Sequence, residues 1–285
     1  MFRLFFVEFY SFLRHRGLLI ALVLLIVLSF IGTSQTFTNT AGISEENLSQ
    51  FNLAFGARAK TVEEFLQWYR TEHFRDFIFR KSFENNAFIL HTCGLLLSLF
   101  FFALPDYKRE SSAAMYAGVN RRNWFLSRLL WYLVLTLLAV NIPMLLLFIF
   151  RIPGWVGNLP DYALRDLLIW LLYQLAVAMN YCFVMVLTKN IFKNVGLGLL
   201  LAVFAFVAAG ATWMIRSWDF GGVWYGLPLF LLCPSVFPMG GQVGTILLGA
   251  DALSENVLLT VCTLGTSIPL HACAAYLLWR RRDLQ

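Results

Sequence analysis

The amino-acid sequence predicts an all-α polytopic membrane protein with six transmembrane helices. Of its 285 residues, 59% are hydrophobic and 13% are charged, about half the charged fraction of a typical soluble domain. Six windows of 18 to 24 residues contain no Asp, Glu, Lys or Arg. A helix needs roughly 20 residues to cross about 30 Å of hydrocarbon. The six windows are residues 17–34, 87–104, 129–150, 167–187, 195–215 and 256–279.

These windows are expected to be helices because lipid offers no hydrogen-bond partner to the backbone. Each amide and carbonyl in hydrocarbon must therefore be satisfied within its own segment, which a helix achieves. The alternative is a large soluble core with six buried helices. That alternative would require six such helices without one charged flank, and we reject it.

Basic residues concentrate in the loops on one side of the predicted spans. That side holds 13 of the 22 basic and 4 of the 16 acidic residues, a net charge of +9. The opposite side has a net charge of −3. Because positively charged loops stay in the cytoplasm, we predict a multi-pass cell-membrane protein with both termini inside. The isoelectric point of about 9.2 then requires no nucleic-acid partner.

Residues 1–16 predict an amphipathic helix that lies in the headgroup layer, ahead of a transmembrane domain formed by residues 17–285. At 100° per residue, the polar side chains share one arc and most apolar side chains lie opposite. A simple extension of the first span is the alternative. The polar arc contains Arg3, Glu8, Ser11, Arg14 and His15, and the apolar arc contains Phe2, Phe5, Phe6, Phe9, Phe12 and Leu13.

Two further segments lie between the spans. Residues 35–86 predict a small helical cap outside the cell, where Thr61 and Glu64 have the spacing of a capping box. Residues 220–250 carry no charge but contain seven glycines and three prolines, which is typical of a broken, re-entrant hairpin. A seventh full span there would place Arg280–Arg282 outside, against the charge distribution.

No strong catalytic or cofactor-binding motif is present. The chain has no Gly-rich P-loop and no His-Glu-x-x-His zinc helix, and its five cysteines have no metal-ligand spacing. Ser267 and His271 lie one helical turn apart in the last span, but no Gly-x-Ser-x-Gly elbow surrounds Ser267. An intramembrane enzyme is therefore the least favoured function, and we expect no catalytic residue, no metal and no cofactor.

Five polar residues inside the predicted spans are candidate functional residues. Polar groups in hydrocarbon are functional candidates by default, although hydrogen bonding between packed helices competes with that interpretation and is favoured here. Asn141 precedes Pro143, whose ring frees a backbone carbonyl that nearby polar groups can satisfy. The five candidates are His91, Asn141, Gln174, Asn180 and His271.

The polar segment 105–125, between the second and third spans, predicts a short cytoplasmic helix. Pro105 ends the second span, an alanine-rich stretch follows, and Gly118 is suited to a C-terminal cap. A short helix held rigidly by two membrane helices can transmit force from a soluble partner. An ordinary positively charged loop is the alternative, and this segment alone favours the loop.

Three features along the chain resemble the membrane subunits of ATP-binding-cassette exporters of the type-2 permease class. Residues 116–128, Tyr-Ala-Gly-Val-Asn-Arg-Arg-Asn-Trp-Phe-Leu-Ser-Arg, are similar to the stretch that ends that family's coupling helix. Residues 275–284 resemble its aromatic, basic and acidic C-terminus. The third feature is the order of N-terminal helix, six spans and broken hairpin. The long first outer loop departs from the pattern and leaves the substrate open.

This resemblance implies a permease subunit in a bacterial plasma membrane. A separate cytoplasmic ATPase subunit would hydrolyse ATP, and a second permease subunit, identical or different, would complete the path; the chain itself would not be an enzyme. A non-transporting scaffold, immunity or sensory protein is the competing hypothesis. The residues implied to contact the ATPase are Asp106, Lys108, Arg109, Glu110, Tyr116, Asn120, Arg121 and Arg122.

Overall fold

The computed structural model is helical, and no strand occurs among the residues it describes. These are residues 2–34, 43–103, 116–151, 163–192 and 254–281, together with Ala114, Gly157, Leu159, Asp161 and Leu200. The prediction of an all-α chain is confirmed for this part of the sequence. The helices are α1 (Phe2–Arg14), α2 (Arg16–Ser34), α3 (Leu48–Phe55), α4 (Val62–Trp68), η2 (Tyr69–Ile78), α5 (Phe79–Ser98), η3 (Leu99–Ala103), α8 (Arg121–Arg151), α9 (Ala163–Phe192) and α13 (Ser254–Arg280), of which η2 and η3 are π-helical.

Two of the described helices are long and apolar enough to cross a membrane. They run from Arg121 to Phe150 in α8 and from Ala163 to Asn190 in α9. The predicted windows 17–34 and 256–279 also lie within single helices, α2 and α13, and 87–104 follows α5 and η3 as far as Ala103. The window 195–215 and the hairpin 220–250 lie outside the described residues.

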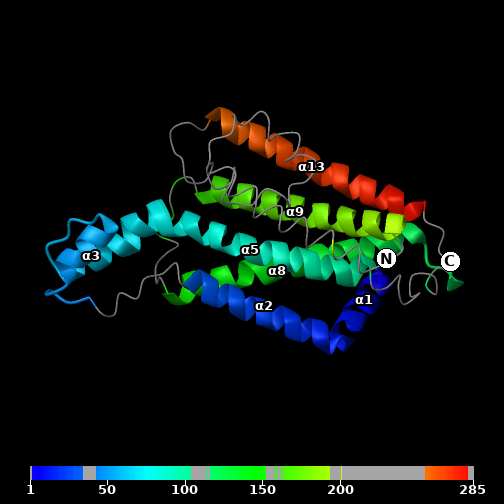
Figure 1. Cartoon of the computed structure of the whole chain (residues 1–285), viewed down its shortest axis with the longest axis horizontal. Helices are drawn as coiled ribbons and strands as arrows, with labels where there is room; N and C mark the ends of the chain where they lie inside the picture. Colours follow the sequence, from blue (N-terminus) through cyan, green and yellow to red (C-terminus); the bar gives the residue numbers. More distant parts are fainter. Residues whose placement is uncertain are drawn as a thin grey trace.

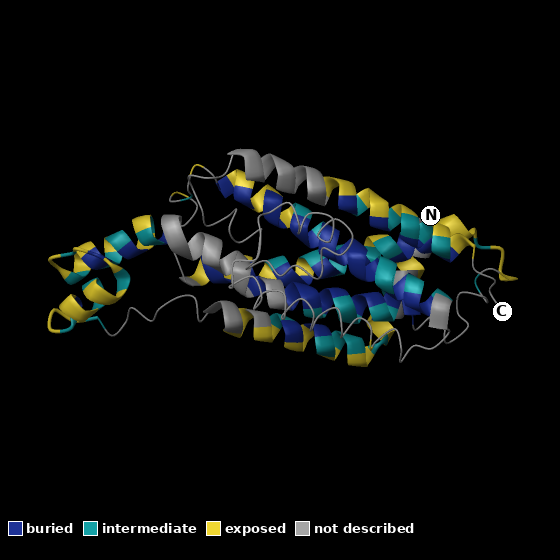
Figure 2. Cartoon of the chain, turned by 45° about the horizontal axis from the view of Figure 1, so that its top comes forward, coloured by how far each residue is buried: buried dark blue, intermediate teal, exposed yellow. Residues whose placement is uncertain are grey.

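The long helices pack side by side, and α9 lies between α13 and α5 (Figure 1). Helix α9 contacts α5, α8 and α13, while α2 lies against α5 and α8. Figure 2 shows buried residues along the inner faces of the long helices and exposed residues along their outer faces. The exposed stripe on α8 is apolar, as expected of a surface that faces lipid rather than water. Its members include Leu138, Ile142, Leu145 and Ile149.

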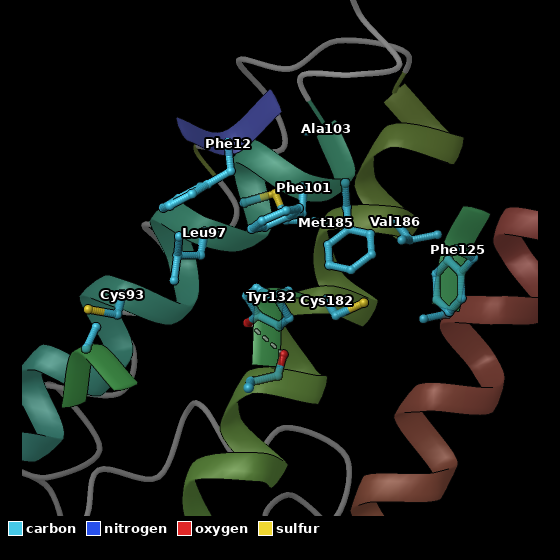
Figure 3. Close-up of a cluster of buried hydrophobic side chains, with 14 of the residues drawn as sticks. Phe12, Cys93, Leu97, Phe101, Ala103, Phe125, Tyr132, Cys182, Met185 and Val186 are labelled. Atoms are coloured by element: carbon cyan, nitrogen blue, oxygen red, sulfur yellow. Dashed lines mark hydrogen bonds between the residues drawn. The ribbon is translucent and has the colours of Figure 1, made fainter. Parts of the chain in front are cut away.

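Helix α1 is separate from α2, because the chain leaves the helical conformation at His15 (Figure 1). Two of its aromatic side chains face the protein. Phe9 stacks on Trp131 of α8, with ring centroids 4.7 Å apart, and Phe12 is buried against Phe101 of η3 (Figure 3). Part of the predicted apolar arc therefore packs on the bundle, while Phe6 stays exposed.

The cap is formed by α3, α4 and η2 around the buried ring of Phe65. The capping box is present in modified form. The hydroxyl of Thr61 accepts a hydrogen bond from the Glu64 amide (3.2 Å), but the Glu64 carboxylate accepts from the amide of Lys60 (2.7 Å), one residue earlier than predicted. Both bonds fix the point at which the helix begins.

The cap does not end where the predicted second span begins. Helical structure is continuous from Val62 to Ala103 through α4, η2, α5 and η3. At 1.5 Å per residue this length is about 60 Å, roughly twice the thickness of the hydrocarbon layer. The predicted boundary between segments 35–86 and 87–104 is therefore not a helix boundary. The cap projects from the bundle on a direct extension of α5 (Figure 1).

Candidate functional site

All five polar candidates bond to side chains of neighbouring helices, and α9 takes part each time. His91 on α5 lies between two tyrosines of α9. Its Nδ1 is 3.2 Å from the hydroxyl of Tyr181, and its Nε2 is 3.3 Å from the hydroxyl of Tyr173. A neutral imidazole has one donor and one acceptor nitrogen, so one tyrosine donates to the ring and the other accepts from it. All three side chains are buried.

Tyr181 can approach α5 because Gly94 lies one turn after His91. A Cβ atom at residue 94 would lie 2.9 Å from Cδ2 of Tyr181, closer than real contacts allow. Tyr132 of α8 completes this junction of three helices. Its hydroxyl lies 3.2 Å from the carbonyl of Gly94 and 2.9 Å from that of Ala178 in α9 (Figure 3). The missing side chain at residue 94 therefore permits the packing that places Tyr181 beside His91.

Asn141 of α8 and Gln174 of α9 form a reciprocal pair of amides. The nitrogen of Asn141 donates to the oxygen of Gln174 (2.7 Å), and the nitrogen of Gln174 donates to the oxygen of Asn141 (2.9 Å). The indole of Trp170 donates to the same Asn141 oxygen at 3.1 Å. The second donor of Asn141 goes to the carbonyl of Leu137 at 2.8 Å. All four hydrogen-bonding positions of the Asn141 amide are thus used within the protein.

Pro143 removes the amide that would pair with the carbonyl of Ala139, four residues earlier, and the sequence predicted that nearby polar groups can satisfy this freed carbonyl. The described backbone contact of Asn141 is with the carbonyl of Leu137, one helical turn before Asn141 itself. Asn141 therefore acts mainly as a connection between α8 and α9.

Asn180 of α9 and His271 of α13 form the third connection. Nδ1 of His271 lies 2.7 Å from the carbonyl oxygen of Ser267, which can only accept, so Nδ1 carries the proton. Nε2 then accepts from the amide nitrogen of Asn180 at 3.2 Å. With its nitrogens engaged in this way, the imidazole is not arranged to take a proton from the Ser267 hydroxyl, as a serine nucleophile would require.

The sequence did not single out the tyrosines and the tryptophan that pair with these candidates. A signal was present, because a buried hydroxyl or indole N–H needs a partner. Tyr132, Tyr173 and Tyr181 each lie in a predicted span, and so does Trp170. We interpret the three connections as a scaffold that holds α9 against its neighbours.

At one end of the bundle, Ala114 and the described residues 116–120 form a compact turn that leads into α8. Gly118 has a positive φ of 82°, and the amide of Val119 donates to the carbonyl of Ala114 at 3.0 Å. This 6→1 bond is the Schellman pattern of a helix C-terminus, in agreement with the predicted role of Gly118. The side chain of Tyr116 is 88% exposed.

Asn120 begins the next helix. Its side-chain oxygen accepts from the amide of Arg122 at 2.9 Å, and its carbonyl accepts from the amide of Trp124 at 3.0 Å. These are the bonds of an N-cap residue. Asn120, predicted as a partner-contacting residue, therefore has a local structural role at the start of α8.

Arg121 links the start of α8 to the end of α13. Its guanidinium donates to the carbonyl of Arg280 at 3.0 Å, and Asn190 of α9 donates to the carbonyl of Leu278 at 3.1 Å. Carbonyls in the last turn of a helix have no partner within that helix. The ring of Phe125 packs against Trp279 beside these bonds, with centroids 5.5 Å apart.

Arg128, the last residue of the stretch 116–128, is a buried basic residue. Its guanidinium lies 4.2 Å from the ring centroid of Trp124 and donates to the carbonyl of Phe101 at 2.9 Å. It thereby ties α8 to η3, where the segment predicted as the second span ends. The remaining predicted contact residues, Asp106, Lys108, Arg109 and Glu110, lie outside the described residues.

No family model, curated protein or solved structure matches the chain. Within the described residues, no group of three or more His, Cys, Asp or Glu side chains is arranged to hold a metal ion.

Proposed function

We propose that this chain is the transmembrane permease subunit of an ATP-driven exporter of the ATP-binding-cassette type-2 class. It forms part of the substrate path and couples to a separate ATPase subunit. In this proposal the chain crosses the plasma membrane six times, carries a re-entrant hairpin at residues 220–250, and keeps both termini in the cytoplasm. A second permease subunit completes the path.

The observation that carries the proposal is the turn from Ala114 to Arg121 and its connections. The exposed Tyr116 lies in this turn, and Asn120 begins α8 directly after it. Arg121 then reaches α13. In this proposal, a partner that binds at Tyr116 displaces α8 and α13 together and so moves these helices between two states.

The distribution of charge at this end of the bundle supports the proposal. The start of α8 and the end of α13 meet there, and Figure 1 shows the N-terminus of α1 at the same end. Exposed basic side chains accompany these helix ends, as expected for the cytoplasmic side. They are Arg14, Arg16, Arg121, Arg122, Arg280 and Arg281.

Co-purification tests the proposal. The tagged chain, expressed in its own host cells, should retain a P-loop ATPase through purification. Arg122→Glu should weaken the complex, whereas Arg58→Glu, an equivalent charge reversal on the exposed cap, should leave it intact. A scaffold without transport would retain no ATPase. Labelling of a cysteine at position 116 from the exterior alone would place the turn in the wrong compartment and overturn the proposal.

A further inference from the structure

The cap contains an open cavity of about 460 Å³, away from the bundle of long helices. This volume lies within the range of small-ligand sites in proteins. One wall is the loop between α3 and α4, residues 56–59, and the other is a single stripe of the helix that follows. The side chains on the helical wall are Glu64, Gln67, Trp68, Thr71 and Glu72.

The loop wall is held in place by hydrogen bonds. Gly56 adopts a left-handed φ of 68° at the end of α3, a conformation that favours glycine. The side-chain amide of Asn52 then bonds both backbone groups of Ala59, accepting from its nitrogen (3.2 Å) and donating to its oxygen (2.7 Å). These two hydrogen bonds order the loop before any ligand binds, so ligand binding does not carry the entropic cost of ordering it.

The helical wall places an indole between two carboxylates. Glu64, Trp68 and Glu72 are spaced four residues apart, and all three line the cavity. One oxygen of Glu64 accepts from the Lys60 amide, while the indole of Trp68 contacts the rings of Phe65 and His73, with centroids 5.8 Å and 5.0 Å away. An aromatic face beside carboxylates is the usual protein environment for an alkylated ammonium group.

The loop wall carries the opposite charge. Arg58 also lines the cavity, and it forms no ion pair with Glu64, Glu72 or any other described residue. A guanidinium is suited to a phosphate or a carboxylate. Charges of both signs therefore face one cavity without neutralising each other among the described residues.

We infer that the cap binds a small zwitterion, with its ammonium group at Glu64, Trp68 and Glu72 and its anionic group at Arg58. Choline phosphates and N-methylated amino acids share this chemistry. The inference concerns the cap alone and does not depend on transport.

Calorimetric titration of the full-length chain, purified in a maltoside detergent, tests this inference with four probes. Phosphocholine and glycine betaine carry both charges, with phosphate and carboxylate as the respective anion. Tetramethylammonium carries the cation only, and inorganic phosphate carries the anion only. At least one zwitterion should bind at least tenfold more tightly than either single-charge probe, and the better of the two identifies the anion. Equal affinity of that zwitterion and tetramethylammonium, or no saturable binding of either zwitterion up to millimolar concentration, would overturn the inference.

Single substitutions test which residues bind the ammonium group and which bind the anionic group. Arg58→Gln should weaken the binding of the zwitterion about tenfold while leaving tetramethylammonium unchanged, and Glu72→Gln should weaken both. Glu63→Gln and Arg70→Gln are matched controls, because both residues are exposed on the same helical segment and neither lines the cavity. Losses of equal size in the controls would show nonspecific electrostatics and refute the site. Trp68→Phe keeps an aromatic face and should retain most of the affinity.

Discussion

The guanidinium of Arg121 donates to the carbonyl of Arg280, a residue 159 positions later in the chain. This contact joins the first turn of α8 to the last turn of α13. Asn190 makes an equivalent bond from α9 to Leu278. The last turn of α13 is therefore bonded to both α8 and α9, and the turn that precedes α8 leads directly into the helix that carries Arg121.

Loss of the Arg121 contact should loosen the end of α13. Arg121→Ala removes a donor to an otherwise unsatisfied carbonyl, and we expect faster amide hydrogen exchange in the peptide that covers residues 277–281. Arg122→Ala is the control, since the Arg122 side chain forms no hydrogen bond with another described residue. Equal acceleration in both variants would mean that the bond does not hold the helix end.

Gly94→Ala should destabilise the protein by about 1–3 kcal/mol, because the added methyl group would meet the ring of Tyr181 at 2.9 Å. Thermal unfolding in detergent measures the effect. Gly265→Ala is the matched control within α13, where a Cβ atom meets nothing within 4 Å. That variant should be neutral or stabilising by up to about 1 kcal/mol, since alanine favours a helix over glycine. Unchanged stability of Gly94→Ala would contradict the close packing.

His91 and Tyr173 should be energetically coupled. Tyr173→Phe removes one bond, while His91→Leu leaves the hydroxyls of Tyr173 and Tyr181 without this partner. In a double-mutant cycle of unfolding free energies, we expect a coupling of about 0.5–1.7 kcal/mol, the range of hydrogen bonds between membrane helices. A coupling energy near zero would show that the contact contributes nothing to holding α5 against α9.

Replacing Asn141 alone should lower the free energy of unfolding more than replacing Asn141 and Gln174 together. Asn141→Leu leaves Gln174 and Trp170 with polar groups that have lost this partner, and we expect a loss of about 1–3 kcal/mol. Adding Gln174→Leu should recover part of this lost stability, because the Gln174 amide that had lost its partner is then also removed. Chemical denaturation of the single and double variants measures this, and simple additivity would argue against a shared hydrogen-bond network.

Local features of the fold follow from short stretches of sequence. The helical windows, the Thr61–Glu64 cap and the left-handed Gly118 depend on residues within a few positions of one another, where composition and spacing determine the backbone. Residue spacing did not determine every bond, because the Glu64 carboxylate accepts from the amide of Lys60 and not from that of Thr61, as a standard capping box would require. The unbroken helix from Val62 to Ala103 was not evident either, because the composition of residues 35–86 is polar whereas that of the predicted span is apolar.

The sequence by itself determined that the chain is helical, which segments are apolar enough for lipid, and which polar residues lie within them. Only the tertiary structure decided how those polar residues pair. His91 meets Tyr181 because glycine at position 94 brings two helices together, and Arg121 meets Arg280 because two distant helix ends coincide. Such pairings depend on how each helix is rotated about its axis and shifted along its neighbours. The spacing of residues within one sequence does not determine either quantity.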